Sequence, residues 1–70
     1  MKRLWLIEKR TTSRLSQAIL AKKAGIAQQT LSSIERGEKG PSVALAKRLA
    51  GVLGFDWTLF YPDEKAKEVS

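Results

Sequence analysis

The sequence predicts an all-α domain of five short helices, and three observations lead to this fold class. Apolar residues recur three and four positions apart in several stretches, which is the spacing of one helix face. Serines stand where helices can begin, and glycines stand where they can end. The chain has 70 residues, and a domain of this size buries only about 60% of its unfolded surface, so a second core is excluded.

The first helix is expected from Lys2 to about Arg10, because this stretch contains neither glycine nor proline. Its apolar residues available for packing are Leu4, Leu6 and Ile7. We interpret Trp5 as a packing residue, since base-stacking surfaces carry several interleaved aromatic side chains. The hydroxyl residues 11–13 compete with the helix backbone and end the helix.

Two short helices joined by a tight turn are predicted next. Ser16 is a good N-cap for a helix over Gln17–Ala24, and Gly25 can end that helix in a left-handed conformation. Ile26 is apolar inside the turn, so we expect it to lie between this helix and a third one over Gln28–Ile34. The arrangement is that of a helix-turn-helix, although any helical bundle can contain such a pair.

The third predicted helix has one apolar and one polar face. Leu31 and Ile34 lie three positions apart and face inward. The outward residues are then Gln28, Gln29, Ser32 and Ser33. This face is uncharged but rich in hydrogen-bond donors and acceptors, which suits the reading of base edges better than the binding of phosphates. The preceding Ala27 is a poor N-cap, with a deficit of about 1 kcal/mol against serine or threonine.

The fourth and fifth helices follow a loop that contains two glycines. Ser42 caps a helix over Val43–Leu53, which Gly54 ends, and Asp56 can cap a last short helix through Phe60. We expect Phe55, Trp57 and Phe60 to close the core. The domain is predicted over residues 1–61, and residues 62–70 are predicted to be a flexible charged tail.

The composition excludes several classes of function. The chain has no cysteine and no histidine, which removes disulfides, thiolate chemistry and the usual zinc sites. No nucleophile and base can be brought together, so we expect neither an enzyme nor a metal or other cofactor. No apolar run approaches the roughly 18 residues that span a bilayer, and the apolar start is too short for a signal peptide. We expect a cytoplasmic protein without a membrane partner.

Charge is unevenly distributed along the chain. Residues 1–54 carry eleven lysines and arginines against three glutamates, whereas residues 55–70 carry two lysines against four acidic residues. The net charge of the whole chain is +6. A basic body with an acidic end indicates a polyanionic partner, although charge of this size can also serve solubility alone.

Residues 3–61 resemble the phage-repressor/Cro family of DNA-binding domains, also called the XRE family. The resemblance is carried by the run L-S-Q-A-I-L-A-K-K-A-G-I-A-Q-Q-T-L-S-S-I-E-R-G and by the G-P-S that follows it. It implies a compact five-helix, phage-repressor-like helix-turn-helix domain. In such domains the second motif helix lies in the major groove of double-stranded DNA.

The resemblance implies roles for individual residues. The expected base-contacting residues are Gln28, Gln29, Ser33 and Ser32. The expected phosphate-contacting residues are Gln17, Ala27, Thr30, Lys39, Gly40 and Arg14. Arg10 and Glu35 match a pair that forms a partly buried salt bridge in relatives; otherwise the carboxylate of Glu35 would repel phosphate. A glutamine amide can bond N6 and N7 of adenine together, so we expect adenine in the half-site.

Three residues depart from the family pattern. Arg14 stands where relatives usually have glycine, so this turn differs or Arg14 reaches a backbone phosphate. Ala27 replaces the usual capping hydroxyl. Lys9 stands where relatives often have an apolar core residue, so the first helix is rotated or buries only the lysine stem.

The favoured function is a sequence-specific transcriptional regulator, a repressor of phage or mobile-element type, acting at the nucleoid of a bacterial or phage-infected cell. Such domains bind near-palindromic operators as homodimers, with half-sites about 34–36 Å apart. The residues expected at the dimer interface are Trp57, Leu59, Phe60 and Tyr61. The alternatives are the DNA-binding antitoxin of a toxin–antitoxin pair, to which the acidic end could contribute, and an interaction module without DNA binding.

Overall fold

The computed structural model describes residues 2–61, and these residues form four α-helices followed by one 3-10 turn. The elements are α1 (Leu4–Thr12), α2 (Gln17–Ala24), α3 (Gln28–Arg36), α4 (Val43–Leu53) and η1 (Trp57–Phe60). The all-α class is as predicted, but the count of five α-helices is wrong because the last element is a single 3-10 turn. The predicted tail, residues 62–70, lies outside the described residues.

Side-chain caps and left-handed glycines set the ends of α2 and α4. The hydroxyl of Ser16 accepts a hydrogen bond from the Ile19 backbone N–H at 3.1 Å, and that of Ser42 accepts one from the Leu45 N–H at 3.2 Å. Gly25 ends α2 with a φ of 72°, a conformation that glycine adopts without the steric cost of a Cβ. These local signals explain why both helices have the predicted bounds.

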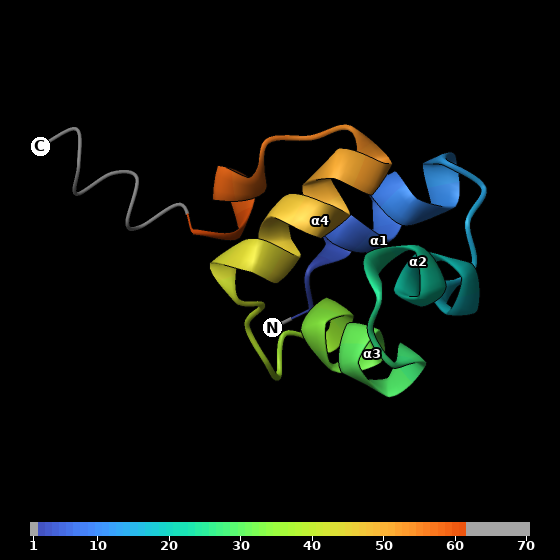
Figure 1. Cartoon of the computed structure of the whole chain (residues 1–70), viewed down its shortest axis with the longest axis horizontal. Helices are drawn as coiled ribbons and strands as arrows, with labels where there is room; N and C mark the ends of the chain where they lie inside the picture. The colour runs from blue at the N-terminus through green and yellow to red at the C-terminus, as the bar shows by residue number, and fades with distance from the viewer. Residues whose placement is uncertain (1, 62–70) are drawn as a thin grey trace, which may run out of the picture.

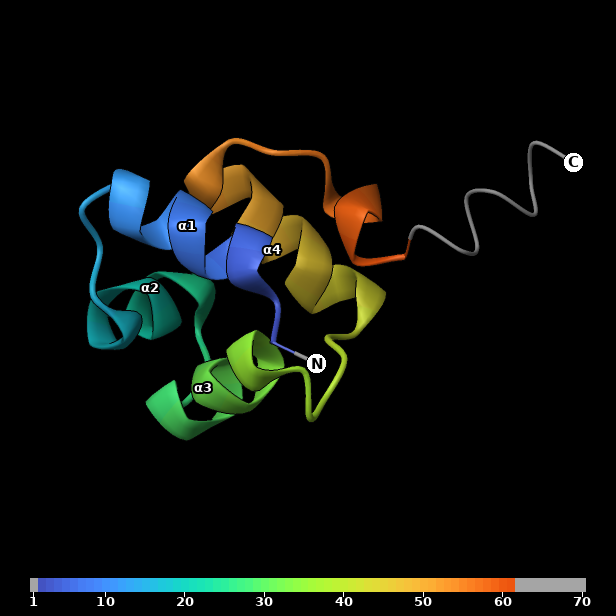
Figure 2. The same cartoon turned by 180° about the vertical axis from the view of Figure 1, so that it is seen from behind.

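Helix α3 lies at one side of the molecule, and α4 with η1 lies on the opposite side (Figure 1; Figure 2 gives the reverse view). Helix α2 packs against both α3 and α4, α1 packs against α3, and α4 packs against η1. Because α3 has neighbours only on its inner side, its outer face stays open to a partner.

One apolar core joins all five elements. Its buried members are Leu6, Leu20, Ala21, Ala24, Leu31, Ile34, Ala46, Leu49 and Phe60. Leu31 and Ile34 are fully buried, which confirms the predicted inner face of the third helix. Burying a leucine or isoleucine side chain contributes about 1.5–3 kcal/mol, so these two residues fix α3 to the rest of the domain.

The first helix is shifted by two residues from its predicted position. Arg3 is the N-cap of α1, with a non-helical ψ of 74°, and its backbone N–H donates to the Glu35 carbonyl of α3 at 2.8 Å. At the other end α1 continues through Thr12, and the Thr11 hydroxyl donates to the Glu8 carbonyl. Leu4 was expected to be available for packing, but it is 67% exposed.

Trp5 and Lys9 of α1 both contact aromatic residues near the end of the described chain. Trp5 makes edge contacts with Phe55 and Phe60, with ring centroids 5.3 and 5.1 Å apart. The packing role of Trp5 is therefore confirmed. Lys9 is half-buried, with its ammonium group 5.7 Å from the centre of the Phe55 ring. Its stem is covered while its charge faces an aromatic surface, which explains a lysine at an apolar position.

Candidate nucleic-acid interface

A tight turn sets the angle between α2 and α3. Gly25 is left-handed, the Ile26 N–H donates to the Ala21 carbonyl at 2.9 Å, and the Ile26 side chain packs against the core as predicted. Arg48 of α4 donates to the Ala24 carbonyl at 3.5 Å, where a positive charge is favourable at the C-terminus of a helix. Helix α3 therefore leaves this turn in a fixed direction.

The start of α3 presents its polar side chains to solvent. Gln28 and Gln29 are exposed, and Thr30 is half-buried. Ala27 is the N-cap and provides no side-chain hydrogen bond, so the first N–H groups of the helix have no cap of this kind. Free N–H groups at a helix N-terminus can bind an anionic oxygen, such as a DNA phosphate.

The two serines of α3 are less available than the sequence indicates. Both are half-buried, and the guanidinium of Arg36 donates to both hydroxyls, at 3.4 Å in the case of Ser33. The same guanidinium pairs with the carboxylate of Glu38, with Nε and Oε2 2.9 Å apart. This contact raises the pKa of Arg36 and lowers that of Glu38, through the hydrogen bond first and the opposite charge second. The sequence gives no sign that Arg36 folds back over its own helix.

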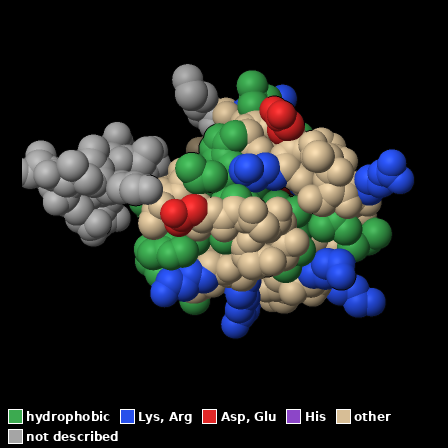
Figure 3. Space-filling view, turned by 90° about the horizontal axis from the view of Figure 1, so that it is seen from above, with side chains coloured by type: hydrophobic (Ala, Val, Ile, Leu, Met, Phe, Trp, Pro, Cys, Tyr) green, Lys and Arg blue, Asp and Glu red, His purple; other side chains and the backbone are tan. Residues whose placement is uncertain are grey.

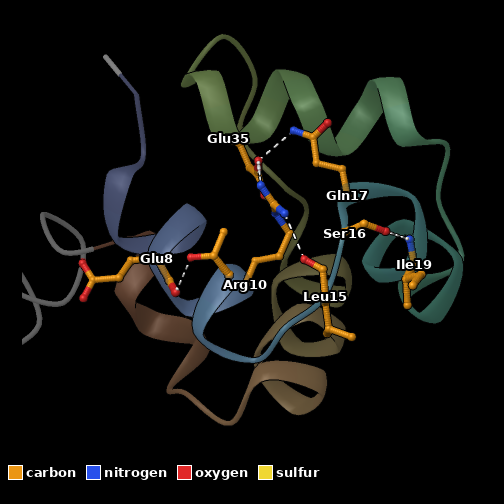
Figure 4. Close-up of polar contacts among 8 residues, drawn as sticks. Glu8, Arg10, Leu15, Ser16, Gln17, Ile19 and Glu35 are labelled. Carbon is orange, nitrogen blue, oxygen red and sulfur yellow. Dashed lines mark hydrogen bonds and ion pairs between the residues drawn. The ribbon is translucent and has the colours of Figure 1, made fainter.

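A buried polar network holds the inner side of α3. Arg10 of α1 donates to both carboxylate oxygens of Glu35, at 2.7 and 3.3 Å, and its third nitrogen donates to the Leu15 carbonyl at 2.9 Å (Figure 4). The amide of Gln17, at the first turn of α2, donates to Glu35 Oε1 at 2.8 Å. Glu35 is only 2% exposed and Arg10 13%. One carboxylate therefore joins α1, α2 and α3.

Arg3 fixes the other end of α3 and the loop after it, a role that sequence reasoning missed. Its guanidinium donates to the carbonyls of Ile34 at 2.6 Å and Lys39 at 3.1 Å, and it lies 5.7 Å from the centre of the Phe60 ring. Lys39 and Gly40, the expected phosphate-contacting residues of this loop, are both exposed. Arg3 therefore holds the loop beside the end of α3, with its lysine side chain free to approach a DNA backbone.

Comparisons with known proteins agree on the class of this domain. The family model for helix-turn-helix proteins matches residues 6–60. The chain belongs to this family. It is an XRE-type, DNA-binding transcriptional regulator and not an enzyme.

Individual relatives extend the comparison. The chain is 40% identical over 63 residues to an uncharacterized HTH-type transcriptional regulator of Bacillus subtilis, YqaF, covering 90% of this chain and 83% of that protein. It is 42% identical over 45 residues to an HTH-type transcriptional regulator of Methanocaldococcus jannaschii, covering 64% of this chain and 68% of that one. Among solved structures, a complex of SinR protein and SinI protein matches with a TM-score of 0.77 and 28% identity. That match covers 96% of this chain but 66% of the other.

Arg14 is a strained residue within the helix-turn-helix domain. It has a φ of 60° and is the one residue other than glycine with a positive φ in the described part of the chain. A side chain in this conformation costs about 1–2 kcal/mol, a cost that glycine avoids. The Arg14 side chain is exposed, in the turn that leads to α2.

The apolar residues of η1 and its C-cap, over residues 57–61, range from buried to exposed. Phe60 was expected at a dimer interface, but it is 7% exposed and belongs to the core, so its ring faces α1 instead. Trp57 and Tyr61 are half-buried, and the Tyr61 hydroxyl donates to the Pro41 carbonyl. Leu59 is 46% exposed. Figure 3, which views the helix-turn-helix domain from above Figure 1, shows hydrophobic side chains emerging between basic ones.

None of the helices within residues 2–61 is both long enough and apolar enough to cross a membrane.

Proposed function

We propose that the protein is a repressor of phage or mobile-element type that reads duplex DNA with α3 in the major groove. The observation that carries this proposal is the pair of exposed glutamines, Gln28 and Gln29, at the N-terminal end of a helix whose inner face is fully buried. In helix-turn-helix proteins the N-terminal residues of this helix contact base edges. A glutamine there can bond N6 and N7 of adenine at once.

The buried network supports the proposal by fixing the position of the reading helix. Gln17 gives one amide N–H to Glu35, and a glutamine amide has two. The second N–H can donate to a phosphate at the start of α2, so one side chain would brace α3 and bind the DNA backbone. Lys39, Gly40, Ala27, Thr30 and Arg14 complete the proposed phosphate contacts.

A homodimer on a near-palindromic operator is part of the same proposal. Leu59, with the half-buried Trp57 and Tyr61, is the surface we assign to the partner subunit. Exposed apolar side chains of this kind are enriched at the centre of interfaces. Sedimentation on DNA with two half-sites measures the stoichiometry, and a single protomer per duplex would contradict the dimer.

The antitoxin alternative depended on residues 62–70, which lie outside the described residues. No contact within residues 2–61 favours it over a repressor. Because a regulator of this family acts where the DNA lies, we propose that the protein is cytoplasmic and nucleoid-associated.

Selection of bound duplexes from a random pool at fixed salt tests the proposed function. We expect a half-site that contains adenine and recurs at a spacing of about one helical turn. Gln28→Ala is expected to relax the preference at one base pair, equivalent to about 1–3 kcal/mol of discrimination. If Gln28→Ala weakens binding to all sequences equally, Gln28 does not read a base.

A further inference from the structure

Arg36 lies on the outer face of α3, together with the proposed base-reading residues. Residues three, four and seven positions apart share one side of a helix, so Gln29, Ser32, Ser33 and Arg36 form one stripe. The contact of Arg36 with both serine hydroxyls places its side chain along this stripe. Its side chain is 47% exposed, so it lies at the surface that we assign to DNA.

The carboxylate of Glu38 occupies Arg36 in the way that a DNA acceptor would. Arg36 donates from Nε to Oε2 at 2.9 Å and from Nη2 to Oε1 at 3.2 Å, which is a two-oxygen, two-nitrogen contact. Two oxygens of a phosphate, or O6 and N7 of guanine, present the same paired acceptors to a guanidinium. While Glu38 is in place, this edge of Arg36 is not available to DNA.

We propose that Glu38 is an intramolecular competitor of DNA for Arg36, so that operator binding exchanges the Arg36–Glu38 contact for an Arg36–DNA contact. This inference rests on the proposed function and adds Arg36, which sequence reasoning did not include among the DNA-contacting residues. The exchange would also release the hydroxyls of Ser32 and Ser33, which Arg36 now holds. Glu38 would therefore control whether the Arg36 guanidinium and the hydroxyls of Ser32 and Ser33 are available to DNA.

The environment of the pair permits this exchange. The Glu38 side chain is 60% exposed, so neither partner is fixed by burial. Exposed ion pairs contribute little to stability and are screened by salt. A DNA phosphate, which also offers charged oxygens, can replace one carboxylate at little cost.

A double-mutant cycle on the selected duplex tests the inference. The variants are Glu38→Gln, Arg36→Met and the two together, with binding measured by fluorescence anisotropy at several salt concentrations. Removal of the competitor is expected to tighten binding of Glu38→Gln by about two- to fivefold. Arg36→Met is expected to weaken binding, and in its presence Glu38→Gln should have much less effect, giving a coupling of at least about twofold.

Control variants separate competition from general charge. Glu8→Gln makes the same charge change at an exposed position of α1, away from α3 (Figure 4), and should leave binding unchanged. If Glu38→Gln tightens binding equally with and without Arg36, the carboxylate simply repels the DNA and the competition is wrong. Absence of any gain in Glu38→Gln would overturn it as well.

The same measurements show whether Arg36 contacts a DNA phosphate or a base edge. Uniform weakening by Arg36→Met on all sequences, with a salt dependence reduced by about one phosphate, indicates a backbone contact. Loss of preference at one G·C pair indicates a guanine edge. Failure of the proposed function is distinguishable, because then the unmodified protein selects no sequence and Gln28→Ala has no effect.

Discussion

Helix α3 contributes one residue to each of two arginine–glutamate pairs, which lie in opposite environments. Glu35 is 2% exposed and bonded by Arg10 and Gln17, whereas Glu38, just beyond the helix end, is 60% exposed and bonded by Arg36. A buried charge that loses its partner remains buried, so the inner pair must be kept intact for folding. An exposed charge that loses its partner is solvated by water, so the outer pair can be exchanged for another ligand. Burial, and not the type of contact, separates a structural pair from one that can take part in binding.

The largest expected effect is the breaking of the inner pair. Arg10→Met leaves the Glu35 carboxylate buried with Gln17 as its remaining side-chain partner, and a loss of about 3–5 kcal/mol in the free energy of unfolding is expected. Urea unfolding followed by circular dichroism measures this loss. Glu35→Gln keeps the shape of the side chain and should cost less. Two near-silent substitutions would mean that the inner pair is not structural.

A smaller effect is expected at Arg14, where the cost lies in the backbone instead of in a buried charge. Arg14→Gly removes the strain of a positive φ but adds backbone freedom to the unfolded chain, so a net stabilisation of up to about 1 kcal/mol is expected. If Arg14 contacts a phosphate, the same variant should bind DNA more weakly, with a lower salt dependence. Stabilisation without any change in binding would remove Arg14 from the interface.

Gly51 offers a position far from both pairs for comparison. It is exposed within α4, and no atom lies within 4 Å of the place where a Cβ would be added. Gly51→Ala is therefore expected to raise the unfolding free energy by about 0.5–1 kcal/mol. The gain should add to the effects of the α3 variants, because distant sites behave independently. A loss of stability would show that α4 requires the glycine for a reason other than space.

The smallest effect on stability is expected at the outer pair. Arg36→Met and Glu38→Gln should leave the urea midpoint unchanged within error, since both side chains are solvated. Their effects should appear in DNA binding alone. A clear fall in the midpoint of either variant would place the outer pair with the structural one and abolish the contrast.

Local signals account for most of what the sequence predicts correctly. The bounds of α2 and α4 follow from Ser16, Gly25, Ser42 and Gly54, each of which acts on its immediate neighbours. The inner face of α3 follows from the spacing of two apolar residues. Where the outcome depends only on nearby residues, one sequence is sufficient.

Distant contacts account for what the sequence does not predict. Arg3 bonds carbonyls 31 and 36 positions away, and nothing near Arg3 in the sequence indicates these acceptors. Helix α3, by contrast, extends two residues beyond its predicted end through a local signal, because it ends only where Gly37 adopts a left-handed φ of 80°. Phe60 is buried by a tryptophan 55 positions earlier, which is why its side chain is not at the surface.

The position of Arg3 has a practical consequence for measurements on this domain. Its N–H is bonded to the Glu35 carbonyl, so the first described residues lie against the C-terminal end of α3 (Figure 1). Any polypeptide joined ahead of residue 2 would emerge next to the loop that carries Lys39. If Lys39 contacts DNA as proposed, an affinity tag at that end would lie beside the contact, and a polyhistidine tag would add its own charge. Such a tag should therefore be removed before operator affinities are compared.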